Sequence, residues 1–181
     1  MTQAKPMTLL LIEDDAAECT KFADCADSRK DITFAGMTSS SDEGIQLLKE
    51  HKPDGIILDL FLYDGKGSGL QFLADLMEDY LEPRPIIVVT THIPPNLVHT
   101  QALNAGVDFI HFKGQSDYSP EMVIKTLLFL WNTMPNPKRS LQSAETDEER
   151  NNRIMAMIDE ELSLISSGLI PRRLRRNFFS S

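Results

Sequence analysis

Three short apolar runs of this sequence close with charged side chains: Ile12–Asp15 (IEDD), Ile56–Leu60 (IILDL) and Ile110–Lys113 (IHFK). Strands that are buried on both faces of a parallel sheet read as nearly continuous apolar runs. Ligands of such sheets bind just beyond the carboxyl ends of the strands. The pattern therefore predicts that several acids and a lysine meet at one edge of one sheet.

Strand-like runs alternate with helical patterns from residue 8 to about residue 131. We predict strands at Thr8–Glu13, Ile32–Met37, Gly55–Asp59, Pro85–Thr90 and Val107–Phe112. We predict helices at about Ala16–Ala26, at 41–52 with Ser41 and Asp42 as its cap, and at Leu70–Leu76, Pro95–Ala105 and Pro120–Trp131. Five such β-then-α units imply a parallel sheet with helices on both faces, in either a flavodoxin-like or a Rossmann strand order.

Charge and cysteine content narrow the class of protein. The formal net charge of −9 disfavours broad binding to nucleic acids or anionic membranes, because the field of the molecule repels polyanions. Cys19 and Cys25 match no ligand or redox spacing, and we expect reduced thiols in a soluble, cytoplasmic protein without membrane spans. The histidines show no metal-ligand spacing and are predicted to be surface or loop residues: His51, His92, His99 and His111.

Five polar side chains fall at the predicted carboxyl ends of strands. Glu13 and Asp14 follow the first strand, and Asp59 ends the third, its neighbour in a flavodoxin-like order. Converging carboxylates repel one another unless a cation lies among them, and Mg²⁺ prefers oxygen ligands and often shares its shell with a phosphate. A carboxylate can also attack a phosphoryl donor, and Asp59 ends the most apolar strand. Thr90 and Lys113 would then contact the phosphoryl oxygens.

Other chemistry fits these positions less well. A haloacid-dehalogenase-type phosphatase needs a second acid two residues after the nucleophile, where Phe61 stands. A flavodoxin needs a phosphate-cradling loop after the first strand, where Glu13–Asp15 would repel the phosphate, and no GxGxxG motif follows that strand. Taken singly, each of the five polar residues also fits a structural role, and Asp15 is predicted as a helix cap.

Taken in order, these motifs resemble those of a response-regulator receiver domain of two-component signalling, over roughly residues 7–131. They are the acidic pair in LLLIEDD, the acceptor in IILDL, the hydroxyl in PIIVVTT and the lysine in AGVDFIHFK. The resemblance implies an α/β fold of the flavodoxin-like (βα)5 type, a doubly wound parallel sheet in the order 2-1-3-4-5. It also implies a phosphoprotein switch rather than a turnover enzyme, with a histidine kinase or a phosphotransfer protein as phosphoryl donor.

The same resemblance assigns a role to each polar residue. Glu13 and Asp14 match the metal-binding acids, and Asp59 matches the phosphoacceptor, which shares the Mg²⁺ site. Thr90 matches the switch hydroxyl and Lys113 the phosphate-contacting lysine. These five residues are therefore the predicted site.

Three departures from the family pattern carry their own expectations. Gly114 stands where a proline usually follows the lysine, which predicts a looser loop, and Ile110 stands where a switch aromatic is usual. The loop Phe61–Gly69 is about two residues longer than usual and lacks the common Met-Pro. Phe61 is bulky and apolar two residues past the acceptor, so we predict that it screens the phosphoryl group from water and slows autodephosphorylation.

The chain after the predicted receiver domain (residues 1–134) divides into a linker at 135–145 and a helical extension at 146–181. Apolar residues recur in the extension at spacings of four, four, three and four: Ile154, Ile158, Leu162, Ile165 and Leu169. An isolated helix of this length is marginal in water, so its apolar stripe should be buried. The sequence leaves two partners open for this stripe, namely a twin helix in a homodimer and the receiver itself.

A basic run near the end of the chain offers an alternative output. Its arginines could contact the phosphates of DNA or RNA: Arg172, Arg173, Arg175 and Arg176. The run lacks interleaved base-reading residues, and the acidic stretch Glu145–Glu149 opposes such binding. A transcription regulator acting directly through this tail is therefore the alternative hypothesis, and docking of the tail onto an acidic protein surface is another.

Overall fold

The computed structural model describes residues 5–62, 68–78, 84–94 and 105–133. Its strands are β1 (Met7–Ile12), β2 (Ile32–Thr38), β3 (Gly55–Asp59), β4 (Ile86–Thr91) and β5 (Phe109–Phe112). Its helices are α1 (Ala16–Asp27), α2 (Ser41–His51), α3 (Gly69–Glu78) and α5 (Pro120–Thr133). All strand pairs are parallel and the sheet order is β2-β1-β3-β4-β5, which confirms the predicted flavodoxin-like fold.

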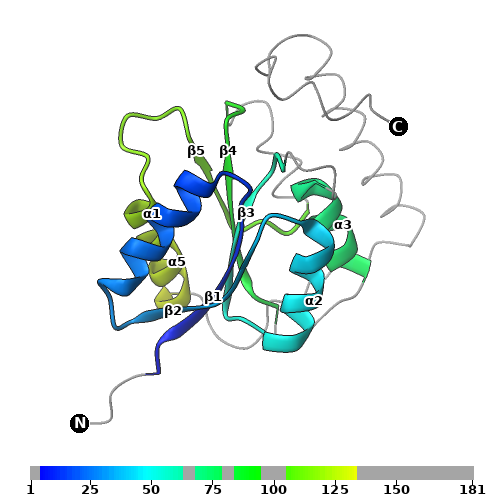
Figure 1. Ribbon diagram of the computed structural model, residues 1–181, viewed down its shortest axis with the longest axis horizontal. Helices are drawn as coiled ribbons and strands as arrows, with labels where there is room; N and C mark the ends of the chain where they lie inside the picture. Colours follow the sequence, from blue (N-terminus) through cyan, green and yellow to red (C-terminus); the bar gives the residue numbers. More distant parts are fainter. Residues whose placement is uncertain (1–4, 63–67, 79–83, 95–104, 134–181) are drawn as a thin grey trace.

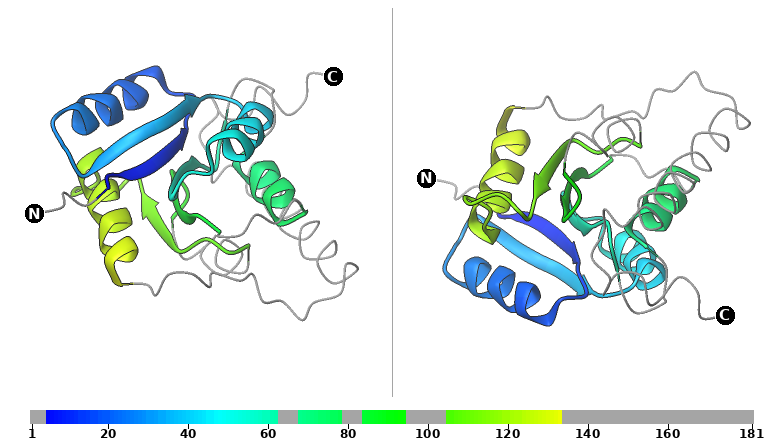
Figure 2. Two further views of the ribbon diagram at one scale, coloured as in Figure 1. Left: turned by 90° about the horizontal axis from the view of Figure 1, so that it is seen from below. Right: turned by 90° about the horizontal axis from the view of Figure 1, so that it is seen from above.

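Helices cover both faces of the sheet (Figures 1 and 2): α1 and α5 lie on one face, and α2 and α3 on the other. Successive side chains of a strand point to opposite faces. Accordingly, Leu9 and Leu11 of β1 join the core of the α1/α5 face, and Leu10 and Ile12 join that of the α2/α3 face. Burial on both sides explains why the strands read as continuous apolar runs.

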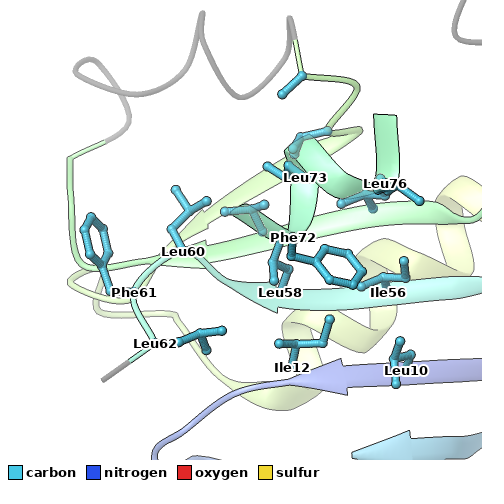
Figure 3. Packing of buried hydrophobic residues seen from close by; sticks show 14 of the residues in the cluster. Leu10, Ile12, Ile56, Leu58, Leu60, Phe61, Leu62, Phe72, Leu73 and Leu76 are labelled. Carbon is cyan, nitrogen blue, oxygen red and sulfur yellow. The ribbon is translucent and has the colours of Figure 1, made fainter. Parts of the chain in front are cut away.

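The α2/α3 face is apolar along the central strand β3. Figure 3 shows Phe72 of α3 beside Ile56 and Leu58 of β3, with Leu73 and Leu76 in the same cluster. Each of these side chains is at most 3% exposed. Burial of one such side chain contributes roughly 1.5–3 kcal/mol. This packing fixes β3 in place and so positions the residue at its carboxyl end.

The helix starts agree with the sequence analysis at α1 and differ at α2. Asp15 caps α1, because its carboxylate accepts two backbone N–H groups of the first turn, as predicted. The prediction that Ser41 and Asp42 cap α2 is wrong. The cap is Ser40, whose backbone is still extended and whose hydroxyl accepts the N–H of the residue three positions on, whereas Ser41 is already helical.

Several predicted segments fall outside the described residues. The helix predicted at Pro95–Ala105 lies almost entirely outside them, as do the linker at 135–145 and the extension at 146–181. The domain boundary at residue 134 therefore stays a prediction. Within the described ranges, no helix combines the length and the apolar character needed to cross a membrane.

Candidate functional site

Three carboxylates gather at the carboxyl ends of β1 and β3. One oxygen atom from each of Glu13, Asp14 and Asp59 lies within 4.8 Å of the other two. Glu13 and Asp59 are 1% and 3% exposed, and Asp14 is half-buried. The parallel register places these strand ends side by side, with Ile12 opposite Leu58. Oxygen ligands so close together suit a hard divalent cation.

A buried lysine faces two of these carboxylates. The Lys113 ammonium donates to Glu13 at 2.8 Å and to Asp59 at 2.6 Å, across 100 and 54 positions of sequence. Lys113 follows the last residue of β5, and its backbone N–H donates to the carbonyl of Thr91 in β4. The sheet therefore aims this ammonium group across β4 toward the acids.

The charges at the site do not balance. Burial, together with the neighbouring Asp59 carboxylate, raises the pKa of Glu13 to about 7, although Lys113 opposes the shift. Burial also raises the pKa of Asp59 above its usual value. For Lys113, burial alone would lower the pKa, but the charges of Asp59 and Glu13 together outweigh it and raise the pKa. One ammonium group among three carboxylates leaves room for a further positive charge.

Backbone contacts fix the orientation of Asp59. Its Oδ1 atom accepts the N–H of Phe61 at 3.0 Å, and the N–H of Leu60 donates to the carbonyl of Thr90. Gly69, at the start of α3, packs against the same point of the chain. A Cβ atom at Gly69 would lie 2.3 Å from the Asp59 carbonyl oxygen, so only glycine fits there without a shift of the backbone.

Thr90 stands beside Asp59 on the next strand. The two residues are register partners between β3 and β4, and Thr90 is fully buried. Its hydroxyl has no hydrogen-bond partner within the described residues. The neighbouring Thr91 differs, because its hydroxyl accepts the N–H of Ile93 at 3.0 Å. An unsatisfied buried hydroxyl beside a buried carboxylate is unusual, since burial of such a group without a partner is unfavourable.

A cavity of about 300 Å³ opens over the acids. Its walls include side chains that the sequence analysis did not place in the site: Glu18, Lys21, His92 and Tyr118. The Tyr118 hydroxyl donates to Glu18 at 3.2 Å, and Lys21 pairs with Glu18 at 2.6 Å. Glu18 and Lys21 share a face of α1 by their spacing of three, but Tyr118 is 100 positions from Glu18, so sequence spacing gave no signal for that contact.

Two further predictions concern the single residues Phe61 and His111. Phe61 is 5% exposed and lines the cavity wall. The prediction that all four histidines lie on the surface or in loops is wrong for His111, which is 7% exposed within β5. Its ring packs beside Phe109, and its Nε2 atom is 2.9 Å from the Thr126 hydroxyl of α5. Strand alternation places His111 on the α1/α5 face, in register with Thr90.

Two of the departures from the receiver pattern, Gly114 and Ile110, lie within the described residues, and their packing is as follows. Gly114 lies against the ring of Phe112, and a Cβ atom there would be 2.4 Å from that ring. A backbone hydrogen bond from Gln115 to the Phe112 carbonyl closes the turn. The loop after Lys113 is thus a hydrogen-bonded turn with a tightly packed glycine, and the looser loop expected from the missing proline stays a prediction. Ile110 packs on the α2/α3 face core as an aliphatic residue.

Comparisons with known proteins agree on one family. The family model described as the response regulator receiver domain matches residues 9–117. The nitrate/nitrite response regulator protein NarL of Escherichia coli K12 is 29% identical over 185 residues, which cover 97% of this chain and 82% of that protein. The response regulator domain of Thermotoga maritima CheB has a TM-score of 0.60 at 18% identity, covering 72% of this chain and 99% of that one. A DNA-binding response regulator of the LuxR family from Staphylococcus aureus has a TM-score of 0.59 at 20% identity, covering 68% and 98%.

Proposed function

Because this chain belongs to the response-regulator receiver family, we propose that it is a phosphorylation-controlled signalling switch whose phosphoacceptor is Asp59. Its phosphoryl donor is a histidine kinase or a phosphotransfer protein. It acts in the cytoplasm, where the free thiols of Cys19 and Cys25 stay reduced. The observation that carries this proposal is the meeting of Asp59 with two further acids and a buried lysine beneath one cavity.

For phosphoryl transfer, the protein has to position the reacting groups and stabilise the charge that develops on the phosphoryl oxygens. A carboxylate oxygen of Asp59 attacks the phosphorus atom of the donor and forms a new P–O bond. The bond from phosphorus to the donor histidine nitrogen breaks, and that nitrogen keeps the electron pair and takes up a proton from solvent. The ammonium of Lys113 already contacts Asp59, so it faces the charge that accumulates on the phosphoryl oxygens.

The acids suit a bound Mg²⁺ ion. Glu13, Asp14 and Asp59 would hold it, since their oxygen atoms lie within 4.8 Å of one another and two of the groups are buried. When bound, Mg²⁺ supplies positive charge that offsets the repulsion between carboxylates and phosphoryl oxygens. Burial and the Asp59 carboxylate raise the pKa of Glu13, and a bound cation would oppose both effects.

Thr90 couples phosphorylation of Asp59 to the neighbouring strands. Its buried hydroxyl lacks a partner within the described residues, and a phosphoryl oxygen on Asp59 would supply one. Reorientation of Thr90 toward that oxygen changes the contacts of β4 with its neighbour β5. His111 lies in register with Thr90 and bonds to Thr126, so α5 is one element that feels the change. A switch needs such a local event coupled to a movable surface.

Phe61 slows the loss of the phosphoryl group from Asp59. Its buried ring forms part of the cavity wall next to the acceptor, where it limits the approach of a water molecule in line with the P–O bond. We expect the Phe61→Asn variant to lose its phosphoryl group several-fold faster than the wild-type protein. Loss of label after removal of the donor measures this rate. A wild-type lifetime of seconds that Phe61→Asn leaves unchanged would count against the screening role.

Beryllofluoride, a stable mimic of a phosphoryl group, tests the switch. We expect beryllofluoride and Mg²⁺ together to slow backbone hydrogen exchange in the segments that carry Asp59, Thr90 and Lys113. The Asp59→Asn variant is the matched control and should show no response. Light scattering on the same samples shows whether the mass of the particle changes. An identical exchange pattern with and without the mimic in the wild-type protein would contradict the proposal.

Direct DNA binding is the second candidate output. The alignment with NarL spans 97% of this chain, so it extends well past residue 134 into the segment with the basic run. Salt-dependent binding to duplex DNA that is lost when Arg172, Arg173, Arg175 and Arg176 are all changed to glutamine would establish this output. Equal behaviour of the wild-type chain and this variant would leave protein–protein contact as the output.

A further inference from the structure

An apolar patch lies along the outer side of α5, next to the edge strand β5. Met122, Thr126 and Phe129 share one stripe of the helix because they recur at spacings of four and three. Thr126 bonds to His111, whose ring contacts that of Phe109, so the stripe and the strand edge form one surface. Its apolar members, here called the β5/α5 patch, are 43%, 39% and 65% exposed: Phe109, Met122 and Phe129.

A charged pair borders this patch on α5. Lys125 and Glu121 form an exposed ion pair at 2.8 Å. Lys125 lies three positions after Met122 and four before Phe129, so the ion pair borders the patch on the exposed side of the helix. Within the described residues of α5, the large exposed apolar side chains are Met122 and Phe129.

The size of the patch indicates what kind of partner it suits. The exposed fractions of its three side chains amount to roughly 300 Å², given the area that a large side chain presents. A stable complex between separate molecules buries about 800 Å² on each partner. A segment tethered to the same chain needs far less contact, because a short linker gives it an effective concentration in the millimolar range. The patch, as far as the described residues define it, therefore suits a tethered segment.

The chain carries a matching segment beyond the described residues. The apolar stripe Ile154–Leu169 would be about 22 Å long as a helix, and α5 with its 14 residues is about 21 Å long. Twenty residues separate Thr133 at the end of α5 from Ile154, enough to span about 65 Å when extended. Pro135 and Pro137 follow α5 directly and end its helical pattern. We propose that the stripe Ile154–Leu169 docks on the β5/α5 patch of its own chain.

Photocrosslinking in the full-length protein tests this docking. Phe129 is replaced by p-benzoylphenylalanine, which keeps an aromatic ring at a site that is 65% exposed. We expect crosslinks from this position to peptides within residues 154–169, in a product of monomer mass. The control carries the same crosslinker at Glu50, an exposed residue of α2 on the opposite face of the sheet, and should give no such product.

Two variants separate specific docking from chance contact. Leu162→Asp places a charge in the stripe, and we expect it to lower the crosslinking yield at least five-fold. Ser163→Asp adds the same charge one residue away, off the stripe, and should leave the yield unchanged. Crosslinks at dimer mass would assign the patch to a second copy and overturn the proposal. Absence of crosslinks to 154–169, or equal yields from both variants, would overturn it as well.

Discussion

The two faces of the sheet are built from the same strands but carry different side chains toward the strand ends. On the α2/α3 face, Ile56 and Leu58 of β3 meet a continuous apolar core. On the α1/α5 face, Ile57 joins a similar core, but the next residue on that side is Asp59, at the strand end. Strand alternation therefore assigns packing to one face, and packing plus chemistry to the other.

This difference explains how the domain carries a cluster of buried polar and charged groups. A row of polar groups on the α1/α5 face runs across the carboxyl ends of neighbouring strands: Glu13, Asp59, Thr90 and His111. A register shift of one residue would move these groups into the apolar face. The α2/α3 face therefore holds the strands in register, and the site depends on that register.

Leu58→Ala should give the largest loss of stability. Leu58 is fully buried, and removal of its side chain leaves a cavity that costs about 2–5 kcal/mol. Denaturant unfolding measures the loss, and binding of beryllofluoride with Mg²⁺ in the folded fraction should change less than about three-fold. The adjacent Asp59→Asn variant should behave in the opposite way, with a small stability change and no binding. Equal effects of both variants on both measurements would erase the distinction between the faces.

Lys113→Met should come next, with a loss of about 3 kcal/mol in metal-free buffer at neutral pH, because Glu13 and Asp59 lose their buried counter-charge. Millimolar Mg²⁺ should restore part of this stability by linkage. Lys125→Met is the control, since Lys125 and its partner Glu121 are both exposed, and should change stability by less than about 0.5 kcal/mol. A deficit in Lys113→Met that Mg²⁺ leaves untouched would argue against a cation site.

Thr90→Val should be neutral or stabilising by up to about 1 kcal/mol, because it removes a buried hydroxyl that lacks a partner within the described residues. The same variant should lose the exchange response to beryllofluoride. Thr91→Val is a matched control on the other face, where the hydroxyl accepts the Ile93 N–H, and should lose about 1 kcal/mol. If Thr90→Val is the more destabilised of the two, the hydroxyl serves structure rather than readout.

His111 should produce the smallest effect, a change in how stability depends on pH. Burial lowers the pKa of His111 below its usual value of 6.5, with Asp117 opposing the shift. The unfolded chain then binds a proton at this histidine more readily than the folded protein does. The contribution of His111 to the free energy of unfolding is therefore fully present above pH 6.5 and decreases as the pH falls, by at most about 1.4 kcal/mol per pH unit. Unfolding of His111→Gln between pH 7 and 5 should show a shallower slope. An unchanged slope would mean that this imidazole does not resist protonation.

The parts of the molecule that the sequence predicted are those with a local signal. The alternation of apolar runs and helical patterns predicted a parallel sheet with helices on both faces, and the resemblance to receiver domains predicted its strand order. The acids and the lysine at strand ends met as expected. Contacts between distant elements left no such signal, as with Tyr118 and Glu18. His111 was misjudged because histidine was treated as polar, although strand alternation places its side chain on the face that α5 covers.

Reaction with a small acyl phosphate tests the central claim most directly. The protein is incubated with the phosphate and Mg²⁺, and intact mass and peptide mapping locate any added phosphoryl group. We predict one phosphoryl group on Asp59, absent in Asp59→Asn and absent when the metal is chelated. Modification at any other residue, or none in the presence of Mg²⁺, would contradict the assignment of this site.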